Sequence, residues 1–426
     1  MKVYKFGGAS VRSAEGIKNI AKIVSTVEDD LFVVVSAMGK TTNALEEVLA
    51  AFMKADKQAA LEKLDEIEAY HFQIIKEVFA EEINGHLSVH SAFAELRNLI
   101  ETGAGDDYDR WYDQIVSYGE VISTLIVSAY FTETKLCNKW LDMRKLLVTD
   151  SNYREANVNM LESERRLRQA INFDDCKIYI GQGFIGSNTQ GRPTTLGREG
   201  SDYTAAVIGN LLDAESVTIW KDVPGVLNAD PRIFQNTIHI PELTYLDAVE
   251  LAFSGAQVIH PKTIKPLENK QIPLYVRPFN NPSESGSVIK AEISKPIDVP
   301  VLILKKNQVL FTIRPLDFSF VLEESLSWIF MVIEKYRLKV SLIQSSAVSI
   351  SICVDNSRYL QRAIDELSTD YRVSYNEGLE LLNIRGINPE IEGELITGKE
   401  IILQQKTRRI GRFVMRSSPK PIPEVD

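Results

Sequence analysis

Short runs of apolar and β-branched residues alternate with amphipathic helical patterns along the first part of the chain. Residues 3–6 and 31–36 have the pattern of strands, and residues 13–27 between them have that of a helix. Such alternation predicts an α/β fold with a mostly parallel central sheet between layers of helices. Ligands of these sheets bind at the carboxyl ends of strands, so site residues are expected there.

The pattern becomes helical between about residues 43 and 110, where glycines are few. Apolar residues recur there at helical spacing: Leu45, Val48, Leu49, Phe52, Leu61, Leu64 and Ile67. This periodicity predicts a helical insertion in the first domain. The aromatic group at residues 70–72 fits helix packing better than a ligand site.

A turn-rich stretch at residues 282–286, followed by residues 295–300, predicts the main domain boundary. We expect one domain at 1–290 and an α+β module at 300–376 with the order βαββαβ. Residues 377–426 supply two further strands, at 379–384 and 400–406, and no helix of full length. The strand at 301–305 is expected to pair with them, the basic run at 408–416 to be a solvated edge, and the tail to be disordered.

Composition narrows the class of protein. The 426 residues are 44% apolar and 25% charged, typical of a globular protein, and the net charge of -10 argues against nucleic acid as the main partner. No apolar run has the length that spans a membrane, and the start of the chain leaves no room for a cleavable signal. Cys137, Cys176 and Cys353 are odd in number and widely spaced, so we expect neither a disulfide framework nor a zinc site, and a reducing cytoplasm fits best.

Three glycine-containing segments follow predicted strands. They are Lys5-Phe6-Gly7-Gly8-Ala9-Ser10, residues 194–206 (TTLGREGSDYTAA) and residues 217–232 (VTIWKDVPGVLNADPR). Glycines allow backbone N–H groups to approach an anion closely, and lysines beside them supply charge for phosphate. Together the segments predict a phosphate site at the edge of the sheet.

Two other glycine patterns are misleading. Gly181, Gly183 and Gly186 satisfy the dinucleotide pattern GxGxxG, but residues 187–193 cannot form the helix that would hold a pyrophosphate. Gly39-Lys40-Thr41 imitates the end of a P-loop, but the first glycine of that motif would fall at Val34, inside a strand.

With residues 36–43, 118–120 and 254–263, the three segments resemble the aspartokinase branch of the amino-acid kinase family. The resemblance covers residues 1–290 as the kinase domain and implies that 300–376 is an ACT-type regulatory module and 377–426 a truncated second one. It implies transfer of the γ-phosphoryl group of ATP to the side-chain carboxylate of L-aspartate, giving 4-phospho-L-aspartate for lysine, threonine and methionine biosynthesis. It further implies Mg²⁺ carried by ATP, with no protein metal ligand assigned, and a homodimer formed through the ACT-like region.

The resemblance also assigns roles to individual residues. Those implied for catalysis are Lys5, Asp202 and Asp222. Those implied for ATP binding are Lys5, Gly7, Gly8, Ser10, Lys221, Asp222, Gly225, Leu227, Arg232 and Gln257. Those implied for aspartate are Ser36, Thr42, Glu120, Arg198 and Ser201, with Arg198 on the α-carboxylate and Glu120 on the α-ammonium.

Several positions depart from the family pattern. Ala9 replaces a usual threonine, Glu199 a usual glycine, Leu227 a usual tyrosine and Gln257 a usual lysine, whereas Lys221 stands where a neutral residue is common. We hypothesise that Lys221 restores the charge missing at Gln257. Lysine-sensitive relatives carry an acidic pair where this chain has Ser341 and Ala347, so we predict weak or absent inhibition by lysine.

Two alternatives stay open. Another amino-acid kinase, such as one acting on glutamate, would share the phosphate loops, although the helical insertion and the ACT-like tail argue against it. A catalytically impaired sensor would explain Glu199 and Gln257, although Lys5, Arg198, Asp202 and Asp222 favour an enzyme.

Overall fold

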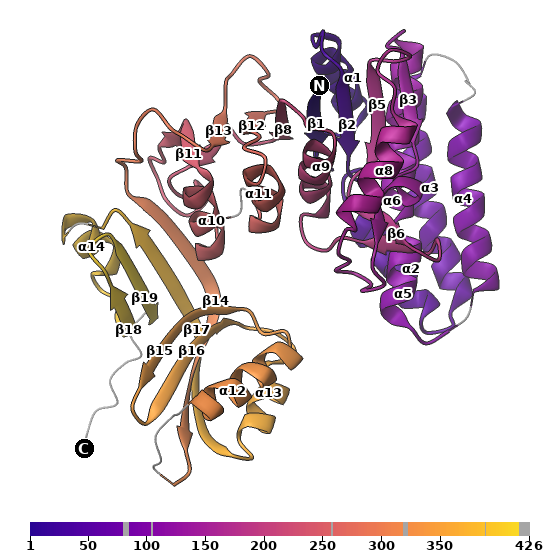
Figure 1. The fold of residues 1–426 in the computed structure, drawn as a ribbon. Coiled ribbons are helices and arrows are strands. Elements are labelled where there is room, and N and C mark those ends of the chain that lie inside the picture. The colour runs from indigo at the N-terminus through magenta and orange to yellow at the C-terminus, as the bar shows by residue number, and fades with distance from the viewer. Residues whose placement is uncertain (80–84, 104, 257–258, 318–322, 388, 417–426) are drawn as a thin grey trace. The chain divides into compact units, whose positions relative to one another are not determined.

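The computed structural model describes residues 1–79, 85–103, 105–256, 259–317, 323–387 and 389–416. The chain divides into two compact units (Figure 1). The first contains residues 1–226, 239–249 and 258–296, and the second contains residues 227–238, 250–257 and 297–426. The assignment of domains to 1–290, 300–376 and 377–426 stays a prediction.

The first unit is built on an eight-stranded sheet whose strands run in the order β11-β13-β12-β8-β1-β2-β5-β3. Every neighbouring pair is parallel except β12 with β13. The mixed α/β fold with a mostly parallel sheet is therefore confirmed. Its strands are β1 (Lys2–Phe6), β2 (Leu31–Val35), β3 (Asn138–Leu141), β5 (Ile178–Gln182), β8 (Ser216–Lys221), β11 (Glu242–Thr244), β12 (Leu274–Pro278) and β13 (Ser287–Lys290).

Smaller strands and the helices surround this sheet. A three-stranded sheet joins β4 (Val148–Thr149), β6 (Ile185–Asn188) and β7 (Pro193–Thr195), and two short strands are β9 (Val226–Leu227) and β10 (His239–Ile240). The helices outside the insertion are α1 (Ala14–Ser25), α6 (Tyr118–Glu133), α7 (Met143–Leu146), α8 (Met160–Ala170), α9 (Gly200–Leu211), α10 (Tyr245–Ser254) and α11 (Pro261–Glu268).

The predicted insertion consists of α2 (Thr41–Phe52), α3 (Lys57–Val78), α4 (Gly85–Thr102) and α5 (Tyr108–Val116), which stand together in Figure 1. Leu45, Val48, Leu49 and Leu64 are fully buried in its core, as their spacing predicts. His71 is also fully buried and contacts the ring of Phe93, so this aromatic group serves packing.

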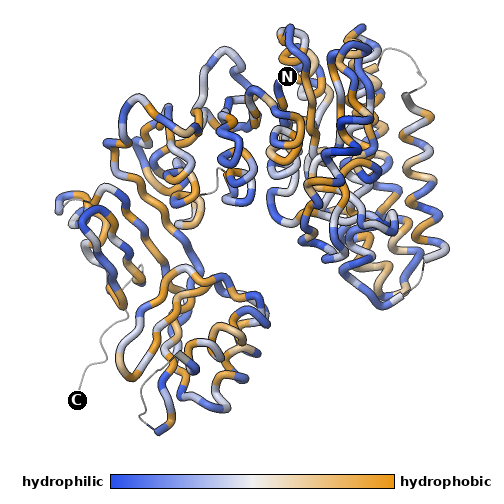
Figure 2. The backbone as a smooth tube through the Cα atoms, viewed as in Figure 1, coloured by the Kyte–Doolittle hydropathy of each residue, from blue (hydrophilic) through white to orange (hydrophobic). Residues whose placement is uncertain are grey.

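The expectation that no apolar run has the length that spans a membrane is wrong for one helical run, residues 108–133, which is long and apolar enough by length and composition. Its most apolar window is 72% buried within the protein, as in a helix of a protein core. Figure 2 shows the same apolar character along the central strands, where all five residues of β2 are buried. Burial in this core accounts for the hydrophobicity of the run.

The second unit contains a six-stranded antiparallel sheet in the order β15-β16-β14-β17-β19-β18. The predicted order βαββαβ is confirmed, and so is the pairing of residues 301–305 with the strand that includes 379–384. Its elements are β14 (Val301–Pro315), α12 (Glu323–Lys335), β15 (Val340–Ser346), β16 (Ser349–Asp355), α13 (Leu360–Leu367), β17 (Tyr371–Arg385), α14 (Pro389–Ile396), β18 (Glu400–Lys406) and β19 (Ile410–Arg416).

The end of the described chain corrects one expectation. The basic run at 408–416 is not merely a solvated edge, because residues Ile410–Arg416 form β19 between β17 and β18. Phe413, Val414 and Met415 are fully buried there. The sequence did not predict this strand because its arginines do not alternate regularly with its apolar residues. The tail at 419–423 lies outside the described residues.

Candidate active site

Two lysines project from neighbouring strands onto the same face of the large sheet. Strand β1 pairs in parallel with β8, so that Lys5 lies beside Ile219. Side chains alternate between faces along a strand, and Lys221, two residues after Ile219, therefore shares the face of Lys5. Tyr4 and Phe6 point to the opposite face, where Phe6 stacks on Trp220 with ring centroids 6.1 Å apart.

The carboxylate of Asp202 lies between these lysines. Its Oδ1 is 2.7 Å from Lys5 Nζ, and its Oδ2 is 3.2 Å from Lys221 Nζ. Burial alone would raise the pKa of Asp202, but the two ammonium groups hold that pKa below its usual range. The structure thus brings together three of the predicted residues in a cluster with one negative and two positive charges, in which Lys5 and Asp202 are buried and Lys221 is half-buried.

The first glycine bend lies beside this cluster. A Cβ atom added to Gly7 would lie 3.4 Å from Lys5 Nζ, and one added to Gly8 would lie 2.7 Å from the Ala37 carbonyl oxygen. Position 8 therefore requires glycine, because the loop after β2 approaches it closely. The Gly8 carbonyl oxygen also accepts a hydrogen bond from the Gly39 N–H in that loop at 3.0 Å. Ser10 is buried, and its N–H donates to the Gly7 carbonyl.

Helix α9 carries Asp202 in its first turn. The N-cap position is Glu199, which has a φ of 52° in the left-handed region and makes no side-chain capping bond. Glycine adopts a positive φ without strain, which explains why glycine is usual in the family at position 199. Ser201 packs closely against Gly183, because a Cβ atom added to Gly183 would lie only 2.5 Å from the Ser201 Cβ. The glycine pattern at 181–186 therefore serves close packing.

Asp113, which sequence reasoning missed, and Lys262, to which it assigned no role, hold the segment that leads into α9. The fully buried Asp113 carboxylate accepts hydrogen bonds from the Thr195 N–H at 2.9 Å, the Thr195 hydroxyl at 2.6 Å and the Arg154 N–H. Lys262 Nζ donates to the Leu196 carbonyl at 3.2 Å. Both contacts fix the chain just before Arg198. Neither could be found in the sequence, because each joins segments far apart in the chain.

Glu120 is a second buried carboxyl group. Its Oε1 accepts a hydrogen bond from the Ala37 N–H at 3.2 Å, whereas its Oε2 has no hydrogen-bond partner in the described part of the chain. Burial raises the pKa of Glu120 to about 8, against the opposing effects of the Ala37 N–H and the Lys5 charge. An orphaned buried carboxyl oxygen favours binding of a cation, such as an ammonium group.

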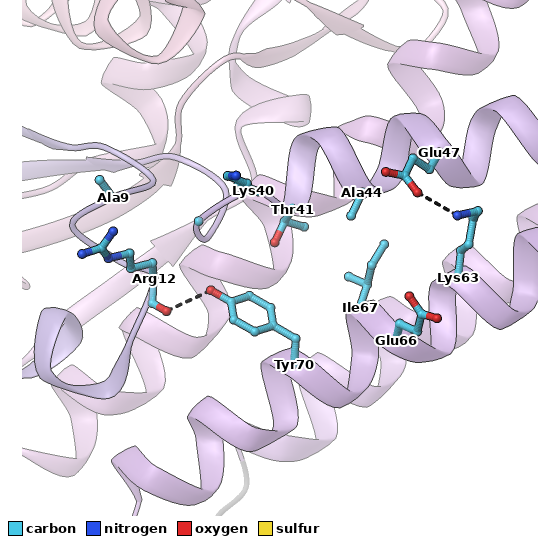
Figure 3. Close-up of a pocket in the computed structure, with 11 residues that line it drawn as sticks. Ala9, Arg12, Lys40, Thr41, Ala44, Glu47, Lys63, Glu66, Ile67 and Tyr70 are labelled. Atoms are coloured by element: carbon cyan, nitrogen blue, oxygen red, sulfur yellow. Dashed lines mark hydrogen bonds and ion pairs between the residues drawn. The ribbon is translucent and has the colours of Figure 1, made fainter.

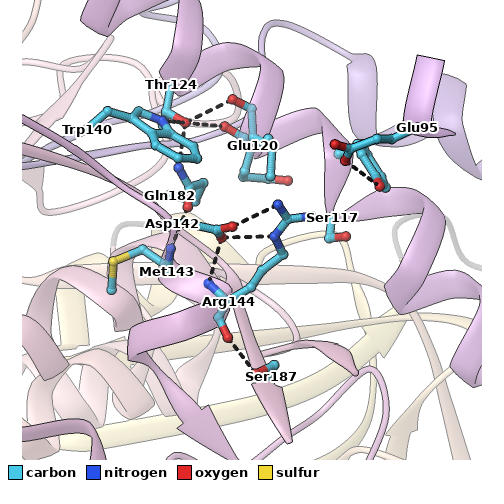
Figure 4. A network of polar contacts seen from close by, with 12 residues as sticks. Glu95, Ser117, Glu120, Thr124, Trp140, Asp142, Met143, Arg144, Gln182 and Ser187 are labelled. Atoms are coloured by element: carbon cyan, nitrogen blue, oxygen red, sulfur yellow. Dashed lines mark hydrogen bonds and ion pairs between the residues drawn. The ribbon is translucent and has the colours of Figure 1, made fainter. Parts of the chain in front are cut away.

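A polar network behind Glu120 fixes its helix (Figure 4). The Thr124 hydroxyl lies 2.9 Å from the Glu120 carbonyl and receives hydrogen bonds from Trp140 Nε1 and Gln182 Nε2. The Gln182 side-chain carbonyl accepts from the Met143 N–H at 2.7 Å. This network ties α6 to β3 and β5, so Glu120 is held by buried and rigid elements.

The remaining residues predicted for aspartate lie around the same strand ends. The Ser36 N–H donates to the Phe6 carbonyl at 3.1 Å, and the Ser36 carbonyl accepts from the Ser123 hydroxyl at 2.7 Å. Thr42 lies in the first turn of α2, and Arg198 is exposed just before α9. Their contacts with substrate stay predictions.

The residues predicted for the nucleotide are brought together only in part. Gly225 lies in a turn with a φ of 140°, where a Cβ would approach His239 Nε2 and Ser287 Oγ to 2.6 Å. Asp222 is exposed, and the carboxylate that pairs with both lysines is Asp202. Leu227 and Arg232 belong to the second unit, where Arg232 pairs with Asp230 at 2.7 Å, and Gln257 lies outside the described residues.

A cleft of about 680 Å³ opens next to the first glycine bend, with Ala9 of that segment in its lining (Figure 3). It is lined by Ala9, Arg12, Lys40, residues of α2 and Tyr70, whose hydroxyl donates to the Arg12 carbonyl at 2.9 Å. Lys5, Asp202 and Glu120 do not line it. The cleft therefore adjoins the predicted site without containing its charged cluster.

This chain is similar in sequence to known proteins. The model of the amino acid kinase family matches residues 1–278. Lysine-sensitive aspartokinase 3 of Escherichia coli is 32% identical over 413 residues, covering 94% of this chain and 89% of that protein. Aspartokinase 1, chloroplastic, of Arabidopsis thaliana is 32% identical over 403 residues, covering 90% of this chain and 68% of that protein.

Solved structures give the same result. E. coli aspartokinase III in complex with aspartate and ADP (R-state) superposes with a TM-score of 0.85 at 29% identity, over 98% of this chain and 96% of that chain. The same enzyme in complex with lysine and aspartate (T-state) gives a TM-score of 0.78 at 29% identity, over 97% and 95%.

Proposed function

The chain belongs to the amino acid kinase family, and from this premise we propose that it is an aspartate kinase. It transfers the γ-phosphoryl group of ATP to the side-chain carboxylate of L-aspartate and forms 4-phospho-L-aspartate and ADP. The observation that carries the proposal is the cluster of Lys5, Asp202 and Lys221, together with the orphaned carboxyl oxygen of Glu120, whose carboxyl group is close enough to feel the Lys5 charge. Relatives named aspartokinase, and a similar structure that binds aspartate and ADP, support it.

The reaction needs no covalent help from the protein. An aspartate carboxylate oxygen attacks the γ-phosphorus, the bond between that phosphorus and the β,γ-bridging oxygen breaks, and ADP keeps the bond electrons. Catalysis then depends on positioning and on stabilising charge on the transferring group. Lys5 and Lys221, held by Asp202, supply that charge, and Gly7 and Gly8 allow backbone N–H groups to approach the phosphates.

Substrate recognition follows from the same elements. Glu120 would accept the α-ammonium of aspartate on its free Oε2, and Arg198 would bind the α-carboxylate with two parallel hydrogen bonds. Ser36, Thr42 and Ser201 would supply hydroxyl groups around the substrate. Asp222, Gly225, Leu227 and Arg232 would contact the nucleotide.

Mg²⁺ would accompany the nucleotide. Over the described ranges, no group of three or more His, Cys, Asp or Glu side chains could hold a metal ion. Mg²⁺ keeps several waters and is bound in such sites mainly through phosphate oxygens. We therefore propose that ATP supplies most ligands of the ion, which neutralises charge on the phosphates.

Assays with two acceptors test the proposal. We expect ADP release coupled to formation of aspartyl hydroxamate when ATP, Mg²⁺, hydroxylamine and aspartate are present, and little product with glutamate. Product formed with glutamate but not with aspartate would favour the alternative that the protein is a glutamate-specific amino-acid kinase. Binding of ATP and aspartate without ADP release would favour a sensor and contradict the enzyme assignment.

Replacing Lys221 tests the charge compensation for Gln257. Because Lys221 contacts Asp202 inside the cluster, we expect Lys221→Thr to lower kcat/KM for ATP about tenfold, as when one hydrogen bond to a charged group is lost. The double variant Lys221→Thr with Gln257→Lys should recover most of this loss. If the single variant keeps its ATP affinity and turnover, the compensation hypothesis is wrong.

Lysine is expected to inhibit weakly or not at all. Ser341 is buried, and its hydroxyl receives a hydrogen bond from Lys305 Nζ at 3.1 Å. An effector ammonium at this place would meet another cation in place of a carboxylate. Steady-state assays with millimolar lysine, run beside the lysine-sensitive E. coli enzyme, measure this. Half-maximal inhibition by submillimolar lysine would contradict it.

Assembly and location complete the proposal. We propose that residues 300–376 form an ACT-type module, that residues 377–426 supply a shortened second one and a tail, and that two chains pair through this region. The exposed edges of the six-stranded sheet, β15 and β18, favour such pairing. We expect the enzyme in the cytoplasm, with no membrane or nucleic acid partner.

A further inference from the structure

Two of the three cysteines lie side by side at one edge of the large sheet. The Sγ atoms of Cys137 and Cys176 are 3.4 Å apart although 39 residues separate them in the chain. Cys137 immediately precedes β3, and Cys176 lies two residues before β5. The parallel pairing of β3 with β5 begins at Asn138 and Ile178, just after the two cysteines, and holds these segments together. Both are free thiols in this structure.

We propose that Cys137 and Cys176 form a redox-active dithiol that closes to an intramolecular disulfide when it meets a small disulfide such as oxidised glutathione. The two sulfur atoms are already 3.4 Å apart, so closure needs only rotation of the side chains and a small approach of these atoms. The edge position of β3 leaves room for this movement.

The two thiols differ in a way that sets the order of events. Cys137 is exposed and Cys176 is only 3% exposed. Burial raises the pKa of Cys176, and its thiol donates weakly to the Ile178 carbonyl at 3.4 Å. Cys137 is thus the group that an external disulfide can reach, and Cys176 is the resolving group within reach of it.

The exchange proceeds in two balanced steps. The Cys137 thiolate attacks one sulfur of oxidised glutathione, forming a mixed disulfide and releasing one glutathione thiolate. The Cys176 thiol then loses its proton to solvent and attacks the Cys137 sulfur, which releases the second glutathione thiolate. The protein loses two hydrogen atoms, and one small disulfide becomes two thiols.

Formation of the Cys137–Cys176 disulfide should stabilise the first unit without altering the candidate active site. The bond would join the amino-terminal ends of β3 and β5, whereas Lys5 and Lys221 lie near the carboxyl-terminal ends of β1 and β8. Closing a loop of this length restricts the unfolded chain. We expect the unfolding transition of this unit to rise by about 5 °C and turnover to stay unchanged.

Intact-mass analysis after incubation with oxidised glutathione tests the proposal. The full chain should lose two hydrogen atoms and retain no glutathione, and peptide mapping should link Cys137 to Cys176. Cys176→Ser, or Cys176→Ala if serine is poorly tolerated in the buried position, should stop with one glutathione on Cys137. Cys137→Ser should stay unmodified, and the matched control Cys353→Ser should behave as the unaltered chain.

Contrary outcomes are equally distinct. A stable glutathione adduct on Cys137 in the unaltered chain would show that Cys176 does not resolve it, and lack of any reaction would show that Cys137 is not reactive. Either result would overturn the proposal. A fall in turnover that follows disulfide formation would overturn the separation of the pair from the site.

Discussion

Lys5→Met is expected to lower kcat about 10³-fold, the largest effect of a single substitution in this protein. Lys5 is 8% exposed and contacts Asp202 at 2.7 Å. Its charge would meet the transferring phosphoryl group in a site from which water is largely excluded. Removing one preorganised donor or cation from such a site costs about 10²-fold to 10⁵-fold in rate.

The measurement is the rate of ADP release at saturating ATP and aspartate. Lys2→Met is the matched control, because Lys2 lies on the same strand and forms a surface ion pair with Asp29 at 2.7 Å. It should keep the turnover of the unaltered enzyme. Circular dichroism and thermal unfolding separate a catalytic loss from a folding defect. Near-normal turnover of Lys5→Met in a folded protein would remove the central residue of the proposed mechanism.

Glu120→Gln is expected to weaken aspartate binding by at least about 100-fold while ATP binding stays nearly unchanged. The substitution keeps the volume of the side chain and its contact with the Ala37 N–H but removes the charge that would pair with the α-ammonium. Loss of one partner of a buried charge pair costs about 3–5 kcal/mol. KM for aspartate and calorimetric titration measure the effect, and Glu133→Gln, an exposed change on the same helix, is the control.

The same carboxyl group predicts a pH dependence of aspartate binding. Without ligand, the raised pKa of about 8 leaves Glu120 mostly protonated at neutral pH. An ammonium group favours the ionised form, so the bound pKa is lower and binding releases a proton. Affinity for aspartate should therefore rise about tenfold per pH unit as pH increases from 6 towards 8, and level off above that.

Calorimetry in buffers of different ionisation enthalpy detects the released proton directly. Glu120→Gln should lose both the proton release and the slope of affinity with pH, whereas Glu133→Gln should keep both. An unchanged slope in Glu120→Gln would assign the titration to another group and would weaken the assignment of Glu120 to the ammonium.

The structure agrees with the sequence on several residues of the site but differs on the contacts that they make. Sequence reasoning placed Lys5, Lys221 and Asp202 at the site, and the structure assembles them. It assigned Asp222 to catalysis as well as Asp202, and in the structure the carboxylate that contacts both lysines is Asp202, whereas Asp222 is exposed. The choice between the two aspartates depends on how α9 packs over β1 and β8, which no local pattern specifies.

Other features depended wholly on contacts between distant segments. Asp113 holds Thr195 across 82 residues of sequence, and Cys137 meets Cys176 across 39. The raised pKa of Glu120 exists because α6 buries it against the loop after β2. Strand β19 was not predicted because its arginines interrupt the alternation of apolar and polar residues. Its apolar residues are buried because the strand lies between β17 and β18.

The sequence alone determined the parallel α/β sheet, the helical insertion, the order of elements in the second unit and the three glycine bends from which a phosphate site is predicted. These follow from periodicity and from the backbone freedom of glycine, both of which act over a few residues. Only the tertiary structure decided which carboxylate pairs with the lysines, which carboxyl group holds a proton, and which thiols meet. Those properties come from burial and from distances between segments far apart in the chain, because desolvation and charge pairing exist only once the fold has formed.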